Sequence, residues 1–103
     1  MSERRAAQRA LVDRVLNGDG RTSTEERARA FGNANLSPPL DALIDKVATN
    51  PTRITDADFT MAANAGYSED QVFELVICAA VGQSTRRYDA GLAALDEATA
   101  ETE

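Results

Sequence analysis

A chain of 103 residues, 43% of them hydrophobic and 27% charged, has room for one soluble domain with a modest core. It has no histidine and one cysteine, Cys78, which excludes a Ser-His-Asp triad, a Cys-His pair, a histidine-bearing metal site and an intrachain disulfide. Its net charge of −6 disfavours nucleic acid and anionic membranes as partners. We also expect a cytoplasmic protein without a membrane span, because no signal-peptide pattern opens the chain and no apolar run approaches ~20 residues.

The N-terminal region predicts two helices joined by a turn. The first covers about residues 2–16, and residues 17–20, with the sequence NGDG, end it with strong turn formers. Apolar residues recur within it at helical spacing: Ala7, Leu11, Val15 and Leu16. The second helix opens at Ser23, because Ser23-x-x-Glu26 has the pattern of a capping box, and it runs to about Phe31.

Proline and glycine delimit the third and fourth helices. We expect Ser37 to be the N-cap of the third, with Pro38 at its first helical position, and the helix to stop before Pro51. Thr55 is the expected N-cap of the fourth helix, and Gly66 is its expected C-terminal stop. The apolar face of the third helix consists of Leu40, Leu43, Ile44 and Val47, and that of the fourth of Phe59, Ala62 and Ala63.

The fifth helix contains the longest apolar run. Ser68-x-x-Gln71 opens it, and residues Val72 to Val81 are apolar nearly all round, so we expect burial on more than one side. We expect Gly82 to kink or interrupt the helix before an amphipathic stretch. The apolar positions of that stretch are Tyr88, Leu92 and Leu95. A domain this small has little chain left to surround such a helix, so we predict a homo-oligomer whose subunits share it.

These patterns predict an all-α fold, a single compact helical domain of about five helices that spans residues 1–103. Residues 1–36 supply the N-terminal helices and a loop, and residues 37–98 form the core. Residues 99–103 are expected to be a disordered acidic tail. No second domain or internal repeat is expected.

The stretch AGYSEDQVFELVICAAVG, residues 65–82, resembles the alkylhydroperoxidase D-like and carboxymuconolactone decarboxylase superfamily. The resemblance covers about Asp56–Leu95 and implies orthogonal helix packing of the alkylhydroperoxidase D type in a dimer, trimer or hexamer. Peroxidase members carry Cys-x-x-Cys followed by a histidine, and those positions would fall on Pro51, Ile54 and Asp58 in this sequence. Because none of the three is a cysteine or a histidine, the resemblance implies a scaffold without dithiol peroxidase chemistry.

We interpret Cys78 as a core residue. Its neighbours Ile77, Ala79 and Ala80 are apolar, and burial raises the pKa of a thiol, which disfavours the nucleophilic thiolate. Free cysteine commonly behaves as a small hydrophobic side chain. The resemblance also places Cys78 well after the family's reactive position, so we expect no thiol chemistry from it.

DNA binding is one hypothesis, because the fourth and fifth helices match helix-turn-helix spacing at Ala62, Gly66 and Val72. A DNA reader presents the start of its second helix to bases and phosphates. Here that start carries Glu69 and Asp70, whose charges would repel the DNA backbone. We therefore expect no nucleic-acid binding.

An enzyme without histidine or a dithiol is a second hypothesis. The candidate catalytic residues are Asp58, Glu74, Arg86, Arg87 and Tyr88. The carboxylates would exchange protons, and the arginines and the tyrosine would bind or polarise an anion. By resemblance, the substrate would be a small carboxylated molecule or a peroxide. Carboxylates in a helix's first turn, however, also simply favour the positive end of the helix dipole.

We favour a third hypothesis, a noncatalytic oligomeric binding or interaction module. It would use the interface of the apolar fifth helix to bind a small apolar ligand or a partner protein, for example a dithiol-bearing relative. The missing catalytic residues are consistent with this class. We expect no cofactor and no metal ion.

Overall fold

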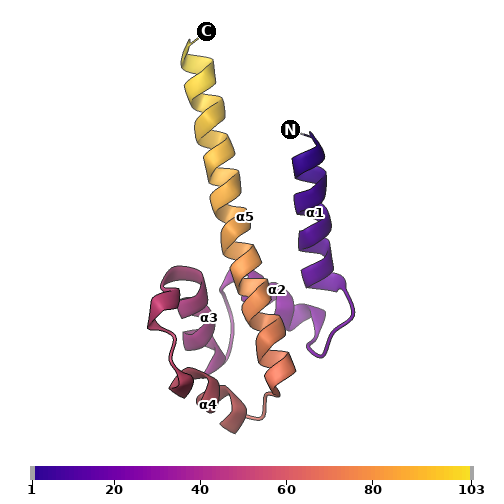
Figure 1. Ribbon diagram of the computed structural model, residues 1–103, viewed down its shortest axis with the longest axis vertical. Coiled ribbons are helices and arrows are strands. Elements are labelled where there is room, and N and C mark those ends of the chain that lie inside the picture. The colour runs from indigo at the N-terminus through magenta and orange to yellow at the C-terminus, as the bar shows by residue number, and fades with distance from the viewer. Residues whose placement is uncertain (1, 103) are drawn as a thin grey trace.

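The computed structural model describes residues 2–102 and contains helices but no strand over that range (Figure 1). The elements are α1 (Ser2–Asn17), α2 (Thr24–Gly32), α3 (Leu40–Thr49), the short 3₁₀ helix η1 (Pro51–Arg53), α4 (Asp56–Asn64) and α5 (Glu69–Thr102). The prediction of an all-α fold with about five helices is therefore confirmed.

Local capping groups begin three of the helices where the sequence predicts: Ser23 for α2, Thr55 for α4 and Ser68 for α5. At the start of α2 the backbone N–H of Glu26 donates to Ser23 Oγ at 3.0 Å. At the start of α5 the N–H of Gln71 donates to Ser68 Oγ at 3.1 Å, and the N–H of Ser68 donates to Gln71 Oε1 at 2.8 Å. This reciprocal pair is a complete capping box.

Gly66 ends α4 as expected. Its φ of +101° is in the region that favours glycine, and Gly66 N–H donates to the Ala63 carbonyl oxygen at 3.0 Å. The next residue, Tyr67, donates its N–H to the Ala62 carbonyl oxygen at 3.2 Å. The two bonds form a Schellman motif, which satisfies carbonyl groups at the helix end and turns the chain toward α5.

The predicted start of α3 is wrong by two residues. The helix begins at Leu40, with Pro39 at the cap position, and the Ser37 side chain makes no capping bond. The physical reason is that Pro38 precedes another proline, and a residue before proline is disfavoured in the helical region. Ser37 instead accepts a backbone hydrogen bond from the N–H of Asp41 at 3.3 Å.

The prediction that Gly82 interrupts the fifth helix is also wrong, since α5 continues without a break through Thr102. Gly82 is buried where α5 crosses the end of α2, and a Cβ built on it would collide with the carbonyl oxygen of Phe31. The missing side chain thus allows the two helices to approach closely. Residues 99–102, expected to be a disordered tail, are helical, and Glu103 lies outside the described residues.

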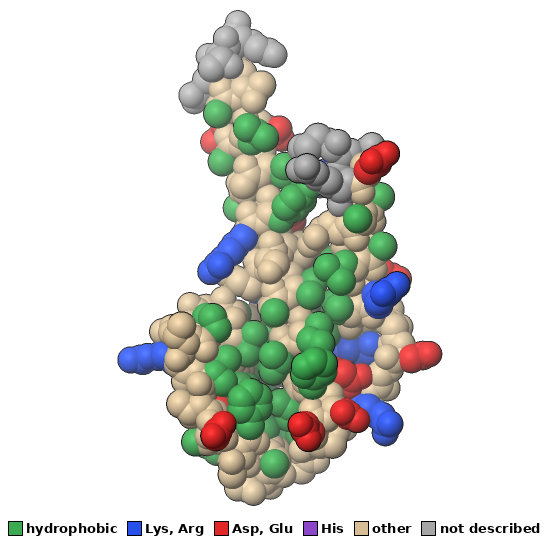
Figure 2. Space-filling model, in the orientation of Figure 1, with side chains coloured by type: hydrophobic (Ala, Val, Ile, Leu, Met, Phe, Trp, Pro, Cys, Tyr) green, Lys and Arg blue, Asp and Glu red, His purple; other side chains and the backbone are tan. Residues whose placement is uncertain are grey.

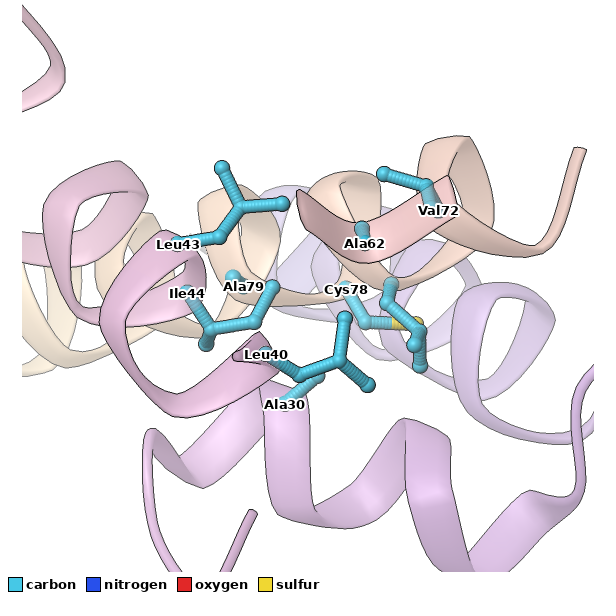
Figure 3. Close-up of a cluster of buried hydrophobic side chains, with 9 residues drawn as sticks. Ala30, Leu40, Leu43, Ile44, Ala62, Val72, Cys78 and Ala79 are labelled. Carbon is cyan, nitrogen blue, oxygen red and sulfur yellow. The ribbon is translucent and has the colours of Figure 1, made fainter. Parts of the chain in front are cut away.

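The core lies between the first half of α5 and the helices α2, α3 and α4 (Figure 3). Its buried members are Ala30, Leu40, Leu43, Ile44, Ala62, Val72, Leu75, Cys78 and Ala79. The predicted apolar face of α3 is confirmed, because three of its four residues are buried and Val47 packs against them. Only Ala62 of the predicted α4 stripe is buried.

Helix α5 is covered on one side only. Its buried residues point toward the core, whereas the side chain of Phe73 is 64% exposed and that of Ile77 is 36% exposed. On α1, Val15 packs on the core but Leu11 is exposed. Apolar side chains accordingly gather on the face of the molecule seen in Figure 2. Burial of the apolar run on more than one side is therefore incomplete within this chain.

Helix α1 runs antiparallel to α5 (Figure 1). Gln8 Nε2 donates to Thr85 Oγ1 at 2.7 Å near one end of the pair, and Cys78 Sγ donates to the Val15 carbonyl oxygen at 3.3 Å near the other. Beyond the N-terminus of α1, the last turns of α5 project from the body of the molecule (Figure 1). The principal extents are 57 × 29 × 20 Å, and the radius of gyration of 15.9 Å exceeds the ~13 Å typical of 100 residues because of this projection.

Candidate functional site

Asp58 lies in the first turn of α4, where it is held by two neighbours. Lys46 Nζ from α3 lies 2.8 Å from Asp58 Oδ1 and 3.0 Å from Oδ2, and the backbone N–H of Thr55 donates to Oδ2 at 2.9 Å. These bonds, first the one from Lys46 and then the one from Thr55, lower the pKa of Asp58 below its ordinary value. The carboxylate links α3 to the start of α4, which is a structural role.

Glu74 lies in α5 beneath the loop that joins α1 and α2. Its carboxylate accepts the backbone N–H of Arg21 at 2.6 and 2.8 Å and the N–H of Thr22 at 3.1 Å. A Cβ built on Gly20 would collide with Glu74 Oε1, so the loop approaches the carboxylate closely because residue 20 is glycine. Glu74 therefore fixes this loop on α5.

Arg27 fixes the same loop from the opposite side. Its buried guanidinium donates from Nη1 to the Gly18 carbonyl oxygen at 2.6 Å and from Nη2 to the Thr22 carbonyl oxygen at 3.2 Å. Glu74, Arg27 and Cys78 line a small cavity of about 110 Å³. The loop thus donates to the Glu74 carboxylate and provides two acceptors for the Arg27 guanidinium, whereas the buried Nε of Arg27 has no hydrogen-bond partner among the described residues.

Cys78 is buried at the edge of that cavity, with 1% of its surface exposed. Burial is the main cause that raises the pKa of its thiol; the positive charge of Arg27 opposes the shift and the negative charge of Glu74 adds to it. A buried thiol with a raised pKa is a poor nucleophile at neutral pH. This placement agrees with the interpretation of Cys78 as a core residue.

The remaining candidates, Arg86, Arg87 and Tyr88, are consecutive residues of α5, but their side chains lie in different environments. Arg86 Nη1 donates to the Phe31 carbonyl oxygen at 2.7 Å, and Nη2 donates to Gln83 Oε1 at 3.0 Å, so Arg86 caps the C-terminal end of α2. Arg87 is exposed. Tyr88 lines a groove of about 350 Å³ between α1 and α5.

The five candidate catalytic residues therefore do not share a pocket. Asp58 belongs to the contact between α3 and α4, Glu74 to the loop anchor, and Arg86 to the end of α2. In the part of the chain that the structure describes, none of these cavities is lined by more than one of the five candidates. Among residues 2–102, the candidates thus do not form a proton-transfer pair beside an anion site.

A groove between α4 and α5, larger than the one beside Tyr88, was not singled out by the sequence. It has a volume of about 660 Å³ and is lined by Phe59, Thr60, Ala63, Tyr67, Glu69, Val72, Phe73 and Val76. Its only hydroxyl groups belong to Thr60 and Tyr67, and the Tyr67 hydroxyl donates to Glu26 Oε2 at 3.4 Å. Burial, followed by the charge of Glu26, raises the pKa of Tyr67, so its proton stays in place at neutral pH.

The signal for this groove was present in the sequence as apolar residues on both α4 and α5. Phe59 and Ala63 are one turn apart on α4, and Val72, Phe73 and Val76 share one side of α5. Periodicity alone assigned these residues to a core. It could not show that the two helices diverge enough to leave their apolar faces open.

The described residues form an all-helical protein with an apolar groove, and they do not bring the five candidate catalytic residues together. Comparisons with known proteins give no matching family model, no matching curated protein and no matching solved structure. Within residues 2–102 no helix has the length and hydropathy that a membrane span requires, and no group of three or more His, Cys, Asp or Glu side chains could hold a metal ion.

Proposed function

We propose that the protein is a cytoplasmic, oligomeric binding module without dithiol peroxidase chemistry, built on a scaffold like that of the alkylhydroperoxidase D and carboxymuconolactone decarboxylase superfamily. The sequence resemblance of residues 65–82 and the helical architecture support the scaffold. The burial of the single thiol and its raised pKa support the absence of sulfur chemistry.

The observation that carries the proposal is the contrast between the candidate catalytic groups and the groove. Asp58, Glu74 and Arg86 each bond to neighbouring helices or loops, which leaves them occupied in holding the fold together. Aromatic and aliphatic side chains, by contrast, line the groove between α4 and α5, where Phe59 is 44% and Phe73 is 64% exposed. Exposed apolar surface in a concave site typically marks a binding surface.

The chemistry of the groove fits a small, mostly apolar ligand. Its volume of about 660 Å³ lies within the range of ligand pockets, ~300–1,000 Å³. Phe59 and Phe73 provide flat apolar surface from opposite helices. The hydroxyl groups of Thr60 and Tyr67 donate to Asp56 and Glu26, so their oxygens can accept a hydrogen bond from one polar substituent. Glu69 makes a neutral ligand a better fit than an anionic one.

Titration with the neutral fluorescent probe N-phenyl-1-naphthylamine tests this function. We expect a saturable rise in fluorescence that Phe73→Glu removes, because the substitution puts a charge into the groove. Met61→Glu is the matched control, since Met61 is 55% exposed on α4 but does not line the groove, and it should bind as the parent does.

Equal probe binding by the Phe73→Glu variant and the parent, or the absence of saturable binding, would overturn the groove as the binding surface. Turnover of a hydroperoxide that is lost in Cys78→Ser would overturn the noncatalytic part of the proposal. In both experiments circular dichroism at helical wavelengths establishes that each variant is folded.

A further inference from the structure

We propose that the protein forms a two-fold symmetric dimer in which the projecting end of α5 from each copy packs into the groove between α1 and α5 of the other. This inference rests on the oligomeric part of the proposed function and specifies its interface. The interface is separate from the groove between α4 and α5, so each can be tested without the other.

The projecting end of α5, residues 92–102, has an apolar face that its own chain covers only in part. Leu92 is half-buried and Leu95 is 56% exposed, and both continue the face of α5 on which Tyr88 lies, at spacings of four and three residues. No other element of residues 2–102 extends alongside this end (Figure 1). An isolated helical end gains little stability by itself, so a partner that covers Leu92 and Leu95 would stabilise it.

The groove between α1 and α5 offers a matching surface one turn further down the same face. It has a volume of about 350 Å³, and its apolar lining comes from Val12 and Leu16 of α1 and from the ring of Tyr88. Arg5 and Arg9 of α1 line the same groove, together with Asp13 of α1 and Asp89 of α5. The groove therefore combines an apolar floor with charged side chains of both signs, and both of its arginines lie in the N-terminal half of α1.

The charges favour the end of α5 as the occupant of the groove. The projecting end carries Asp96 and Glu97, which are exposed, whereas the N-terminal half of α1 presents Arg5 and Arg9 to the groove. Asp89 of α5 opposes this attraction in part, since it also lines the groove. Like-charged alternatives are disfavoured: the arginine-bearing α1 of a second copy would meet arginines in this groove. Complementary charge across an interface selects both the partner and its orientation.

The register of α1 on α5 places these charges at the same level. Gln8 bonds to Thr85, and the Val15 carbonyl oxygen accepts a bond from Cys78. The two helices are therefore antiparallel in register: each step of one residue toward the C-terminus of α1 is level with a step of one residue toward the N-terminus of α5. If two copies of α5 cross antiparallel with their Leu92 side chains opposed, the turn containing residues 96 and 97 lies level with about residue 5 of the second copy's α1. Asp96 and Glu97 then face Arg5 and, one turn on, Arg9 of that copy.

In this arrangement a two-fold axis relates the two copies. Each copy supplies one projecting end and one groove, so a single two-fold axis satisfies both and leaves neither exposed. The four helices, α1 and α5 from each copy, form an antiparallel bundle with the leucines and Tyr88 in its centre. The bodies that carry the groove between α4 and α5 lie at opposite ends of this bundle, so ligand binding does not depend on them meeting.

Sedimentation equilibrium of the full chain over a wide range of concentration tests the dimer. We expect a monomer–dimer equilibrium whose dissociation constant rises about tenfold or more with Leu95→Glu, because a charge would enter the centre of the interface. Arg5→Glu with Arg9→Glu should weaken the dimer, and adding Asp96→Arg with Glu97→Arg should restore it, because the charge pairs are re-formed with opposite sign. Phe73→Glu is the matched apolar-to-charge control and should leave the dissociation constant unchanged.

Three results would overturn the inference: a monomer at every concentration, a trimer or hexamer in place of the dimer, or a Leu95→Glu variant that dimerises like the parent. Failure of charge reversal to rescue would overturn the proposed pairing of α5 with α1. The two proposals fail separately, because Phe73→Glu should abolish probe binding in an intact dimer and Leu95→Glu should leave a monomer that still binds the probe.

Discussion

Substitution of Gly82 by alanine is expected to destabilise the protein, although alanine is the better helix former. At an open position inside a helix, replacing glycine with alanine stabilises by about 1 kcal/mol. At Gly82 the added Cβ would collide with the backbone carbonyl of Phe31, and a backbone cannot rotate away as a flexible side chain can. The end of α2 must therefore move away from α5, and Arg86 must give up or lengthen its bond to the same oxygen.

The expected magnitude follows from these opposing effects. Added volume in a close-packed contact costs about 1–3 kcal/mol, and contact with backbone places Gly82→Ala near the upper end of that range. Subtracting the propensity gain of about 1 kcal/mol leaves a net loss of about 2 kcal/mol in the free energy of unfolding. Gly32→Ala in α2 is the matched control, because a Cβ there meets nothing within 4 Å, and it should stabilise by up to about 1 kcal/mol.

Urea unfolding followed by circular dichroism measures both variants, with the protein concentration held fixed because association changes apparent stability. The two substitutions should shift the unfolding midpoint in opposite directions. A Gly82→Ala variant as stable as the parent, or more stable, would refute the close approach of α2 and α5. A loss in Gly32→Ala equal to that in Gly82→Ala would refute the distinction between the two sites.

Three further predictions concern Glu74, Cys78 and Asp58. Glu74→Gln should lower the free energy of unfolding by about 1.5–3 kcal/mol, because hydrogen bonds to a charged group are lost. Its control, Asp70→Asn in the exposed first turn of α5, should lower the free energy of unfolding by less than about 1 kcal/mol, and urea unfolding measures both variants. Cys78 should resist iodoacetamide at neutral pH in the native protein and react once urea unfolds it, and rapid alkylation of the native protein, read by mass spectrometry, would contradict its burial. Since the folded-state pKa of Asp58 is lowered, its carboxylate stabilises the fold above the unfolded-state pKa of about 3.9, and this contribution is lost as the pH falls through the folded-state pKa. Stability measured at a series of pH values should therefore fall less steeply below about pH 4 in Asp58→Asn than in the parent, and parallel curves would count against the ion pair with Lys46.

The sequence was sufficient for features that depend on near neighbours. The capping box of Ser68 and Gln71 closes within three residues, and the Schellman motif at Gly66 closes within five, so the residue types alone determine both. The apolar face of α3 is likewise predictable, because a repeat at helical spacing identifies the side that must be buried.

The roles of the candidate site residues could not be predicted because their partners are distant in sequence. Glu74 bonds to backbone groups 52 and 53 residues away, and Arg86 to a carbonyl 55 residues away. A carboxylate or a guanidinium suited to proton transfer or anion binding is equally suited to capping a helix or holding a loop. Only the position of the partner distinguishes these roles, and sequence spacing contains no information about a backbone N–H half a chain away.

Helix length explains why the apolar face of α5 was expected to be more deeply buried than it is. The 34 residues of α5 span about 51 Å, whereas the 16 residues of α1 span about 24 Å. Because α1 is the element that lies along the upper part of α5, about half of the length of α5 has at most one neighbour from its own chain. A pattern of apolar residues indicates which surface of a helix is suited to burial, but it does not indicate whether the same chain or another one buries that surface. The exposed Phe73 and Leu95 are on opposite halves of this helix, and the two proposals accordingly assign them to different surfaces.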